Sequence, residues 1–352
     1  MKDKFLNTIV PQTAALEITY DCNHKCVFCS VPWDSPRKNY ARLPELSIAE
    51  WKECIKTLVG HGIKSIAFTG GEPLLKLGII ELIEYAGNIK VKEPIFNSND
   101  ELIDYKDIPL KMSLITNGEL IDDKWIKLFK KYSIDLVVSL PGSKTFKEHT
   151  GGGDYQKVMG SISKLSKAGL NVVIGVCVTK KNLPELFETI ALGFLNGANQ
   201  LLLNRFLPGG RGTDRMELCL NKDEVTQMFD LAEEACTAAN TYGSVGTEVP
   251  KCVITKEYKM LKIGTMCSGG IDFFAVDPSG RVRPCNHSPV TTGTYKDIIS
   301  AIRSDYWQTF KNRDFLPKEC GSCQMAIECD GGCREAAHII YGKIDSLDPL
   351  LT

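Results

Sequence analysis

The sequence of 352 residues has little net charge, few histidines and no long apolar run. With 42 Lys and Arg against 43 Asp and Glu, its net charge of −1 provides no electrostatic footprint for nucleic acid or an anionic membrane. No apolar run reaches about 18 residues, which excludes a membrane-spanning helix, and the polar segment 1–12 lacks the apolar stretch of a signal peptide. The five histidines are scattered, and none is paired with an acid in a catalytic pattern. These absences predict a cytoplasmic protein without a nucleic-acid or membrane partner.

Cysteine, by contrast, is abundant, and the chain contains 14. Without an export signal this number argues for metal ligands rather than disulfides, because the cytosol keeps thiols reduced. Three of them, Cys22, Cys26 and Cys29, have the spacing C-x3-C-x2-C directly after the apolar run 14–20. Thiolates bind zinc, copper(I) or iron–sulfur clusters. Zinc usually takes four protein ligands in tetrahedral pairs, whereas three thiols on one loop suit a cubane cluster with one open iron. A zinc site and a chance grouping of buried thiols are the alternatives.

Strand-like and helix-like segments alternate up to about residue 240. Strands are expected at 14–20, 65–69, 111–116, 135–139, 172–178 and 200–204. Helices are expected at 48–59, 74–86, 121–132, 158–165, 186–194 and 221–240, with a polar, irregular surface insertion at 90–110. Six successive strand–helix units imply parallel pairing with right-handed crossovers. Because six units fall short of the eight in a full barrel, the predicted fold is α/β, an open partial (β/α)6 TIM-like barrel.

Unusual residues follow the ends of these strands, where the chemistry of such barrels gathers. The cysteine triplet follows the first strand, and the stretch Thr69-Gly70-Gly71-Glu72-Pro73 follows the second. Asn117 follows the third strand, Ser139 closes the fourth, and Arg205 follows the sixth. Paired glycines allow positive φ and close approach of the backbone to a ligand, and Glu72 can accept hydrogen bonds from an ammonium. The plainer alternative is a turn with an exposed Glu, and Pro73 also suits the first position of a helix.

The C-x3-C-x2-C triplet with an aromatic before its last cysteine, followed by G-G-E-P, resembles the radical S-adenosylmethionine superfamily over residues 14–215. The resemblance implies that Cys22, Cys26 and Cys29 ligate three irons of a [4Fe–4S] cluster and that S-adenosylmethionine chelates the fourth. The cofactor-binding residues that it implies are Phe28, Thr69, Gly70, Gly71, Glu72, Pro73, Asn117, Ser139 and Arg205. Phe28 would lie near the adenine, and the glycines with Glu72 would hold the methionyl ammonium. In this family the reduced cluster cleaves the cofactor to a 5′-deoxyadenosyl radical, which abstracts a hydrogen atom.

A second cysteine set lies in the last third, with Cys320, Cys323, Cys329 and Cys333 at the spacing C-x2-C-x5-C-x3-C, preceded by Cys267 and Cys285. Such pairs could also bind zinc. Next to a radical core they resemble the SPASM domain, which carries auxiliary iron–sulfur clusters. The resemblance implies a first auxiliary cluster on Cys267, Cys285 and Cys333, and a second on Cys320, Cys323 and Cys329.

Two features depart from that pattern. The gap between Cys267 and Cys285 is longer than usual, and no cysteine follows Cys333. The fourth ligand of the second cluster is therefore open, and the candidates are Asp330, His338, Asp348, an exogenous ligand or none. Cys252 is expected to be either the fourth ligand of the first auxiliary cluster or an ordinary buried thiol.

Four regions follow from these patterns: an N-terminal tail (1–13), the radical core (14–215), a closing helix and linker (216–249) and the SPASM-type domain (250–352). Outside the cysteine sets, Cys54, Cys177, Cys219 and Cys236 are expected to pack as small hydrophobes. Cys219 is also a candidate hydrogen-atom donor, because it follows the sixth strand. Residues 206–212 are expected to form a flexible loop that faces the substrate, or a plain connector.

The resemblance implies a peptide-modifying radical oxidoreductase, since SPASM enzymes mostly act on peptides or proteins to crosslink, epimerise or oxidise them. An external electron donor such as flavodoxin or ferredoxin would serve it. The barrel begins too early for a leader-recognition domain, so the leader of a peptide substrate is expected to be held by a separate leader-binding protein or by the barrel itself. Formylglycine formation is a weaker candidate, because Asn286 stands where a carboxylate would act as base. A radical dehydrogenase of a small-molecule alcohol or sugar and a non-catalytic iron–sulfur or zinc scaffold are the alternatives.

Overall fold

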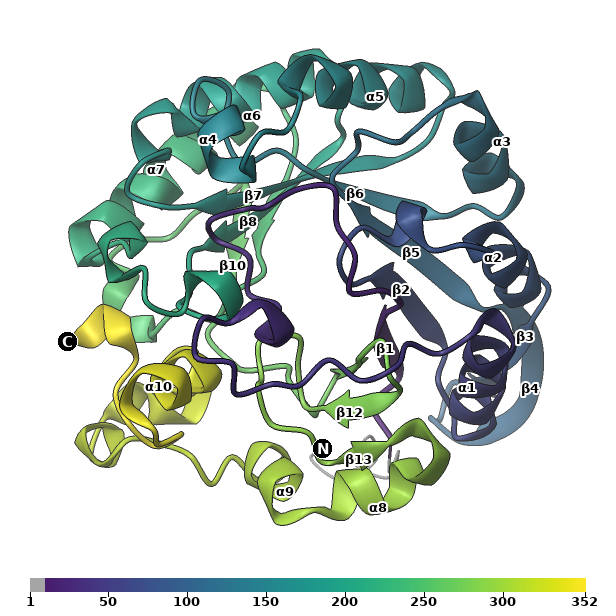
Figure 1. The fold of residues 1–352 in the computed structure, drawn as a ribbon. Coiled ribbons are helices and arrows are strands. Elements are labelled where there is room, and N and C mark those ends of the chain that lie inside the picture. The colour runs from purple at the N-terminus through teal and green to yellow at the C-terminus, as the bar shows by residue number, and fades with distance from the viewer. Residues whose placement is uncertain (1–9) are drawn as a thin grey trace.

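The structure is a computed structural model that describes residues 10–352, so most of the expected tail 1–13 lies outside the described residues. Figure 1 shows its strands arranged as a curved wall around a central space, with helices on the outside. Six strands form the middle of the wall in the order β8-β7-β6-β5-β2-β1. They are β1 (Thr13–Glu17), β2 (Ser65–Thr69), β5 (Lys111–Thr116), β6 (Asp135–Ser139), β7 (Val172–Val178) and β8 (Gln200–Arg205). All neighbours among them pair in parallel, which confirms the predicted partial barrel.

The helices follow the strands as expected. They are α1 (Ile48–Gly60), α2 (Ile79–Gly87), α3 (Asp123–Lys131), α4 (Phe146–Thr150), α5 (Tyr155–Lys167), α6 (Leu186–Leu195) and α7 (Lys222–Ala238). Capping boxes start α1, with Ser47 and Glu50, and α7, with Asn221 and Glu224. The predicted helix 74–86 is divided, because Gly78 adopts φ +82° and α2 begins only after it. The short α4 was not predicted.

Residues 90–110 are a surface insertion but are not irregular. Strands β3 (Lys90–Phe96) and β4 (Leu102–Pro109) form an antiparallel hairpin of their own. Its polar sequence obscures the strand pattern, because β4 is exposed along nearly its whole length and therefore shows no apolar alternation. Cross-strand pairs such as Lys106 with Glu93 stabilise it instead.

The last third of the chain extends the wall at both ends. Strands β9 (Gly243–Val245) and β10 (Leu261–Ile263) add to β8, while β11 (Phe273–Val276) pairs in parallel with β1. The strands β12 (Arg281–Arg283) and β13 (Gly293–Thr294) continue the sheet in antiparallel fashion. Three further helices, α8 (Ile298–Arg303), α9 (Asp305–Asn312) and α10 (Arg334–Tyr341), lie near these strands (Figure 1). Residues 250–352 thus share one sheet with the core.

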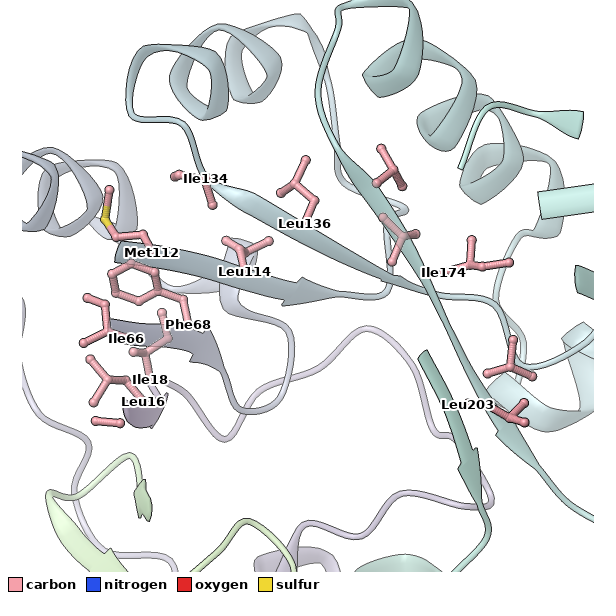
Figure 2. Close-up of a cluster of buried hydrophobic side chains, with 14 of the residues drawn as sticks. Leu16, Ile18, Ile66, Phe68, Met112, Leu114, Ile134, Leu136, Ile174 and Leu203 are labelled. Carbon is pink, nitrogen blue, oxygen red and sulfur yellow. The ribbon is translucent and has the colours of Figure 1, made fainter. Parts of the chain in front are cut away.

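The hydrophobic core lies between the wall and the outer helices. Figure 2 shows Leu16, Ile66, Phe68, Leu114, Leu136, Ile174 and Leu203 from six neighbouring strands in one buried cluster. The strands alternate between buried and half-buried side chains, as in Val172–Val178. Since successive side chains of a strand point to opposite faces, the half-buried ones face the central space. Within residues 10–352, no helix is long and apolar enough to cross a membrane.

Candidate active site

A cavity of about 730 Å³ occupies the space inside the wall. The inward-facing side chains near the carboxyl ends of the strands line it, namely Thr69, Ile115, Ser139, Cys177 and Asn204. Phe28 and Cys29 of the first cysteine loop also line it, and so do Cys267, Cys285 and Cys333. Two cysteine sets that are far apart in the sequence therefore share one cavity.

The first cysteine loop is held by two other segments. The N–H groups of Lys25 and Val27 donate to the carbonyls of Thr150 and His149 in α4, at 2.8 and 2.9 Å. On the other side, the Arg211 N–H donates to the Cys29 carbonyl at 2.8 Å. The segment 206–212 is therefore not simply a substrate-facing loop or connector, because part of it clamps the cluster loop.

The thiols of this loop are half-buried, and burial raises the pKa of each. The pKa of Cys29 rises to about 11, and that of Cys26 is raised further by its neighbours Cys29 and Cys22. A raised pKa keeps these thiols protonated in the absence of metal. A bound metal favours the thiolate instead, because a coordinating thiol is deprotonated. The Sγ of Cys22 already accepts the N–H of His24 at 3.4 Å. Three neighbouring thiols on a pinned loop fit a cluster whose irons each take one thiolate.

Among residues 10–352, no three Cys, His, Asp or Glu side chains could hold one ion together. A cubane cluster does not require the three thiolates to converge on one ion, since each thiolate binds its own iron.

The glycines of the G-G-E-P stretch are needed for a close approach between backbones. A Cβ on Gly70, where φ is +127°, would lie 2.8 Å from the Thr19 carbonyl oxygen, and one on Gly71 would lie 2.0 Å from the Asp21 carbonyl oxygen. The Gly71 N–H donates to Thr19 at 2.8 Å. These contacts place the end of β2 directly against the residues that lead into the cysteine loop.

Glu72 is buried and does not line the cavity. Its side chain is 1% exposed, and its carboxylate accepts from the Leu74 N–H, the Thr116 hydroxyl and the Asn117 N–H, at 3.1, 2.8 and 2.8 Å. Burial raises the pKa of this carboxyl to about 7. The expected alternative of an exposed Glu on a turn is wrong, and the carboxylate anchors the end of β5.

The predicted cofactor-binding residues divide into two groups. Those that line the cavity are Phe28, Thr69, Gly70, Ser139 and Arg205. Those that shape the surrounding loops without lining it are Gly71, Glu72, Pro73 and Asn117. Pro73 starts a 3-10 turn, and the side-chain amide of Asn117 donates to Asn23 at 2.7 Å.

Arg205 connects the cavity to the end of the chain. It is 5% exposed and pairs with the fully buried Asp348 at 2.5 Å. Asp348 also accepts the Cys333 N–H at 2.7 Å. Among the described residues, the Nε of Arg205 has no hydrogen-bond partner. Asp348 is therefore committed to Arg205 and Cys333.

Cys267, Cys285 and Cys333 lie together, as expected. A Cβ on Gly269 would lie 3.3 Å from the Cβ of Cys285 and 3.5 Å from the Sγ of Cys267. Burial raises the pKa of all three thiols, that of Cys333 to about 12. Two carboxylates that we did not predict, Glu248 and Glu335, line the same cavity.

Glu17 is another site residue that the sequence analysis missed. It ends β1, lines the cavity, and pairs with the buried Arg283. The side chain of Asn286 donates to Glu17 at 3.1 Å. The sequence contained a signal for Glu17, because it is an acidic residue inside the apolar run 14–20. Charged residues are almost never fully buried unless they are paired, so a partner for Glu17 could have been expected.

The remaining cysteines correct three expectations. Cys54 and Cys236 are buried in the core as predicted, but Cys177 lines the cavity because it alternates with the buried Val176 and Val178. Cys219, the candidate hydrogen-atom donor, does not line the cavity. Cys252 is exposed, so it is not an ordinary buried thiol.

The family of the chain follows from comparison with known proteins. Residues 16–192 match the radical SAM superfamily. The chain belongs to this family. Its cofactors are accordingly S-adenosylmethionine and a [4Fe–4S] cluster. The pinned triplet Cys22, Cys26 and Cys29 offers three thiols of the kind that ligate such clusters.

Relatives of known function resemble nearly the whole chain. The PqqA peptide cyclase of Gluconobacter oxydans is 23% identical over 97% of this chain and 90% of its own length. An AdoMet-dependent heme synthase of Oleidesulfovibrio alaskensis is 25% identical over 96% of this chain and 86% of its own.

Two solved structures share the fold. Native anSMEcpe with bound AdoMet has a TM-score of 0.72 at 20% identity, over 96% of this chain and 94% of that one. SuiB of Streptococcus suis bound to S-adenosylmethionine has a TM-score of 0.70 at 18% identity, over 96% of this chain and 76% of that one.

Proposed function

We propose that this protein is a radical SAM oxidoreductase that modifies a peptide or protein substrate. The observation that carries the proposal is the shared cavity, which Cys29 and Phe28 line together with Cys267, Cys285 and Cys333. When bound, the cluster and S-adenosylmethionine supply the 5′-deoxyadenosyl radical that takes a hydrogen atom from the substrate. Cys267, Cys285 and Cys333 would hold a second cluster on the same cavity, and this cluster would supply an electron acceptor for a net oxidation.

The residues of this chain have distinct proposed tasks. Cys22, Cys26 and Cys29 hold the core cluster. Phe28, Thr69, Gly70, Ser139 and Arg205 form the walls against which S-adenosylmethionine binds. The carboxylates Glu72 and Glu17 are positioning residues, because they are buried and hold neighbouring backbone and arginine groups.

A peptide is the favoured substrate class. PqqA peptide cyclase carries a peptide in its name, SuiB has been solved with the precursor peptide SuiA, and anSMEcpe has been solved with the Cp18Cys peptide. A small molecule is the second candidate substrate class, because one relative is an AdoMet-dependent heme synthase. The proposal includes an external electron donor such as flavodoxin or ferredoxin, a separate leader-binding protein and auxiliary iron–sulfur clusters.

Anaerobic turnover tests the proposal. The reconstituted protein is incubated with dithionite, S-adenosylmethionine and the peptide encoded by a short open reading frame beside its gene. We expect 5′-deoxyadenosine together with a changed peptide, seen as loss of hydrogen by mass spectrometry or as solvent deuterium gained on epimerisation. Cys26→Ala is expected to abolish both products, while Cys54→Ala, a change in the core of α1, leaves them in place. Absence of 5′-deoxyadenosine with every reductant contradicts the proposal, and 5′-deoxyadenosine with an unchanged peptide contradicts the peptide substrate.

A further inference from the structure

A second cysteine group lies apart from the large cavity. Cys320, Cys323 and Cys329 do not line that cavity, and Cys323 is exposed. Tight turns hold the group, with the Cys323 N–H donating to the Cys320 carbonyl at 3.0 Å. This group presents three thiols near the surface.

A segment from upstream in the chain lies against this group. The 3-10 turn Lys251–Val253 contacts the 3-10 turn Gln324–Glu328. The Lys251 N–H donates to the Sγ of Cys329 at 3.3 Å, and the Lys251 ammonium pairs with Glu328. These contacts fix the backbone on the N-terminal side of Cys252 directly beside Cys329.

Cys252 lies within the same 3-10 turn as Lys251. The turn that it contacts, Gln324–Glu328, is flanked directly by Cys323 and Cys329. The segment that carries Cys252 and the group of Cys320, Cys323 and Cys329 therefore lie side by side.

The other candidate ligands are committed elsewhere. Asp330 accepts the Cys267 N–H at 2.5 Å and pairs with Arg313. His338 lies 3.3 Å from Glu335, and Asp348 pairs with Arg205. The three side chains that the sequence analysis offered as a fourth ligand thus have partners outside this group.

We propose that Cys252 completes a four-thiolate iron–sulfur site with Cys320, Cys323 and Cys329. The sulfur of Cys329 accepts two backbone N–H groups, from Lys251 and Gly331, each at 3.3 Å. Hydrogen bonds to ligand sulfurs help to set the potential of such clusters. This inference rests on the auxiliary-cluster part of the proposed function, but not on the substrate or on cleavage of S-adenosylmethionine. If Cys252 belongs to this site, the first auxiliary cluster has three thiol ligands in the chain, Cys267, Cys285 and Cys333.

Iron binding tests the inference independently of turnover. The full chain is prepared anaerobically with Cys22, Cys26 and Cys29 all changed to Ala, so that iron reports only on the C-terminal sites. In this background, Cys252→Ala is expected to remove about four irons per chain or to leave a three-iron cluster, detected by metal analysis, Mössbauer and EPR spectroscopy. Cys323→Ala is the matched positive control and is expected to act on the same spectral component. Cys236→Ala, in the core of α7, is expected to leave iron and spectra unchanged.

Three results would overturn the inference. The first is that Cys252→Ala leaves the cluster spectrum unchanged while Cys323→Ala removes a component of it. The second is that Cys252→Ala removes the same spectral component as Cys285→Ala, a change in the first auxiliary set, which would assign Cys252 to that set. The third is zinc instead of iron at this site, or no metal in the triple-alanine background. Circular dichroism melting of each variant shows whether a loss of iron reflects unfolding.

Discussion

At the scale of single residues, buried carboxylates hold the parts of the candidate site together. Glu72, Glu17 and Asp348 are each at most 2% exposed, and each binds backbone N–H groups or an arginine. Burying a charged group is costly unless such partners satisfy it. These carboxylates therefore position strands and loops around the cavity.

His338 provides a pH-dependent contact at this scale. Its Nδ1 lies 3.3 Å from the buried Glu335 and 3.0 Å from the Tyr306 hydroxyl, and the hydrogen bond with Glu335 raises its pKa. Because the folded state binds the proton more tightly than the unfolded state, this contact stabilises the fold below about pH 6.5 and is lost as pH rises through the raised pKa.

We expect His338→Gln to lower the free energy of unfolding by about 1 kcal/mol at pH 6, with the difference from the unmodified protein shrinking toward pH 9. Urea unfolding at several pH values measures this difference. A difference that grows as pH rises would contradict the raised pKa.

At the scale of elements, the close approach between the β2 loop and the residues before Cys22 is the most demanding contact. A methyl group at position 71 would lie 2.0 Å from the Asp21 carbonyl oxygen, so the loop must move to accept it. Displacement of a reacting group by about 1 Å can lower a rate about 100-fold.

Gly71→Ala is accordingly expected to lower formation of 5′-deoxyadenosine about 100-fold and to reduce the iron held by the core cluster. Iron analysis and product assay measure both. The matched control is Gly60→Ala, because a methyl group there meets no atom within 4 Å and Gly60 lies in α1. Equal activity of the two variants would show that the approach tolerates a side chain.

Several elements could be predicted from the sequence to the residue. The bounds of β2, β5, β6 and β7 agree with the prediction, because each is a short apolar run that ends at a turn or polar residue. The β3–β4 hairpin could not be predicted, since β4 is exposed along nearly its whole length and shows no alternation of buried and exposed residues. The strands β9 and β10 are three residues long, too short for any periodic pattern.

At the scale of the whole molecule, the candidate site depends on contacts between the first and last thirds of the chain. The sequence predicted both cysteine sets but not their meeting in one cavity, because the distance between Cys29 and Cys267 depends on how the wall closes. The neighbours of Cys252 and the pairing of Arg205 with Asp348 were missed for the same reason. Such contacts join residues far apart in the chain, and local patterns carry no information about them.

The pair of Arg205 and Asp348 ties the end of the chain to β8. Removing one partner of a buried ion pair leaves an uncompensated charge and typically costs 3–5 kcal/mol. We expect Asp348→Ala to destabilise the protein by about that amount, as measured by chemical unfolding. Asp214→Ala, which removes an exposed partner of Arg37, is expected to cost less than about 1 kcal/mol. Similar costs for both variants would mean that the tail is not held by this pair.

The pairing of β1 with β11 also has a consequence for biosynthesis. During translation, β1 is among the earliest segments to leave the ribosome, but its second neighbour, residues 273–276, follows only after three quarters of the chain. Until then one edge of β1 has no partner, and unpaired strand edges promote aggregation. A chain that stops before residue 273 would therefore keep this edge of β1 exposed, and the same segment would be a site for association between incomplete chains.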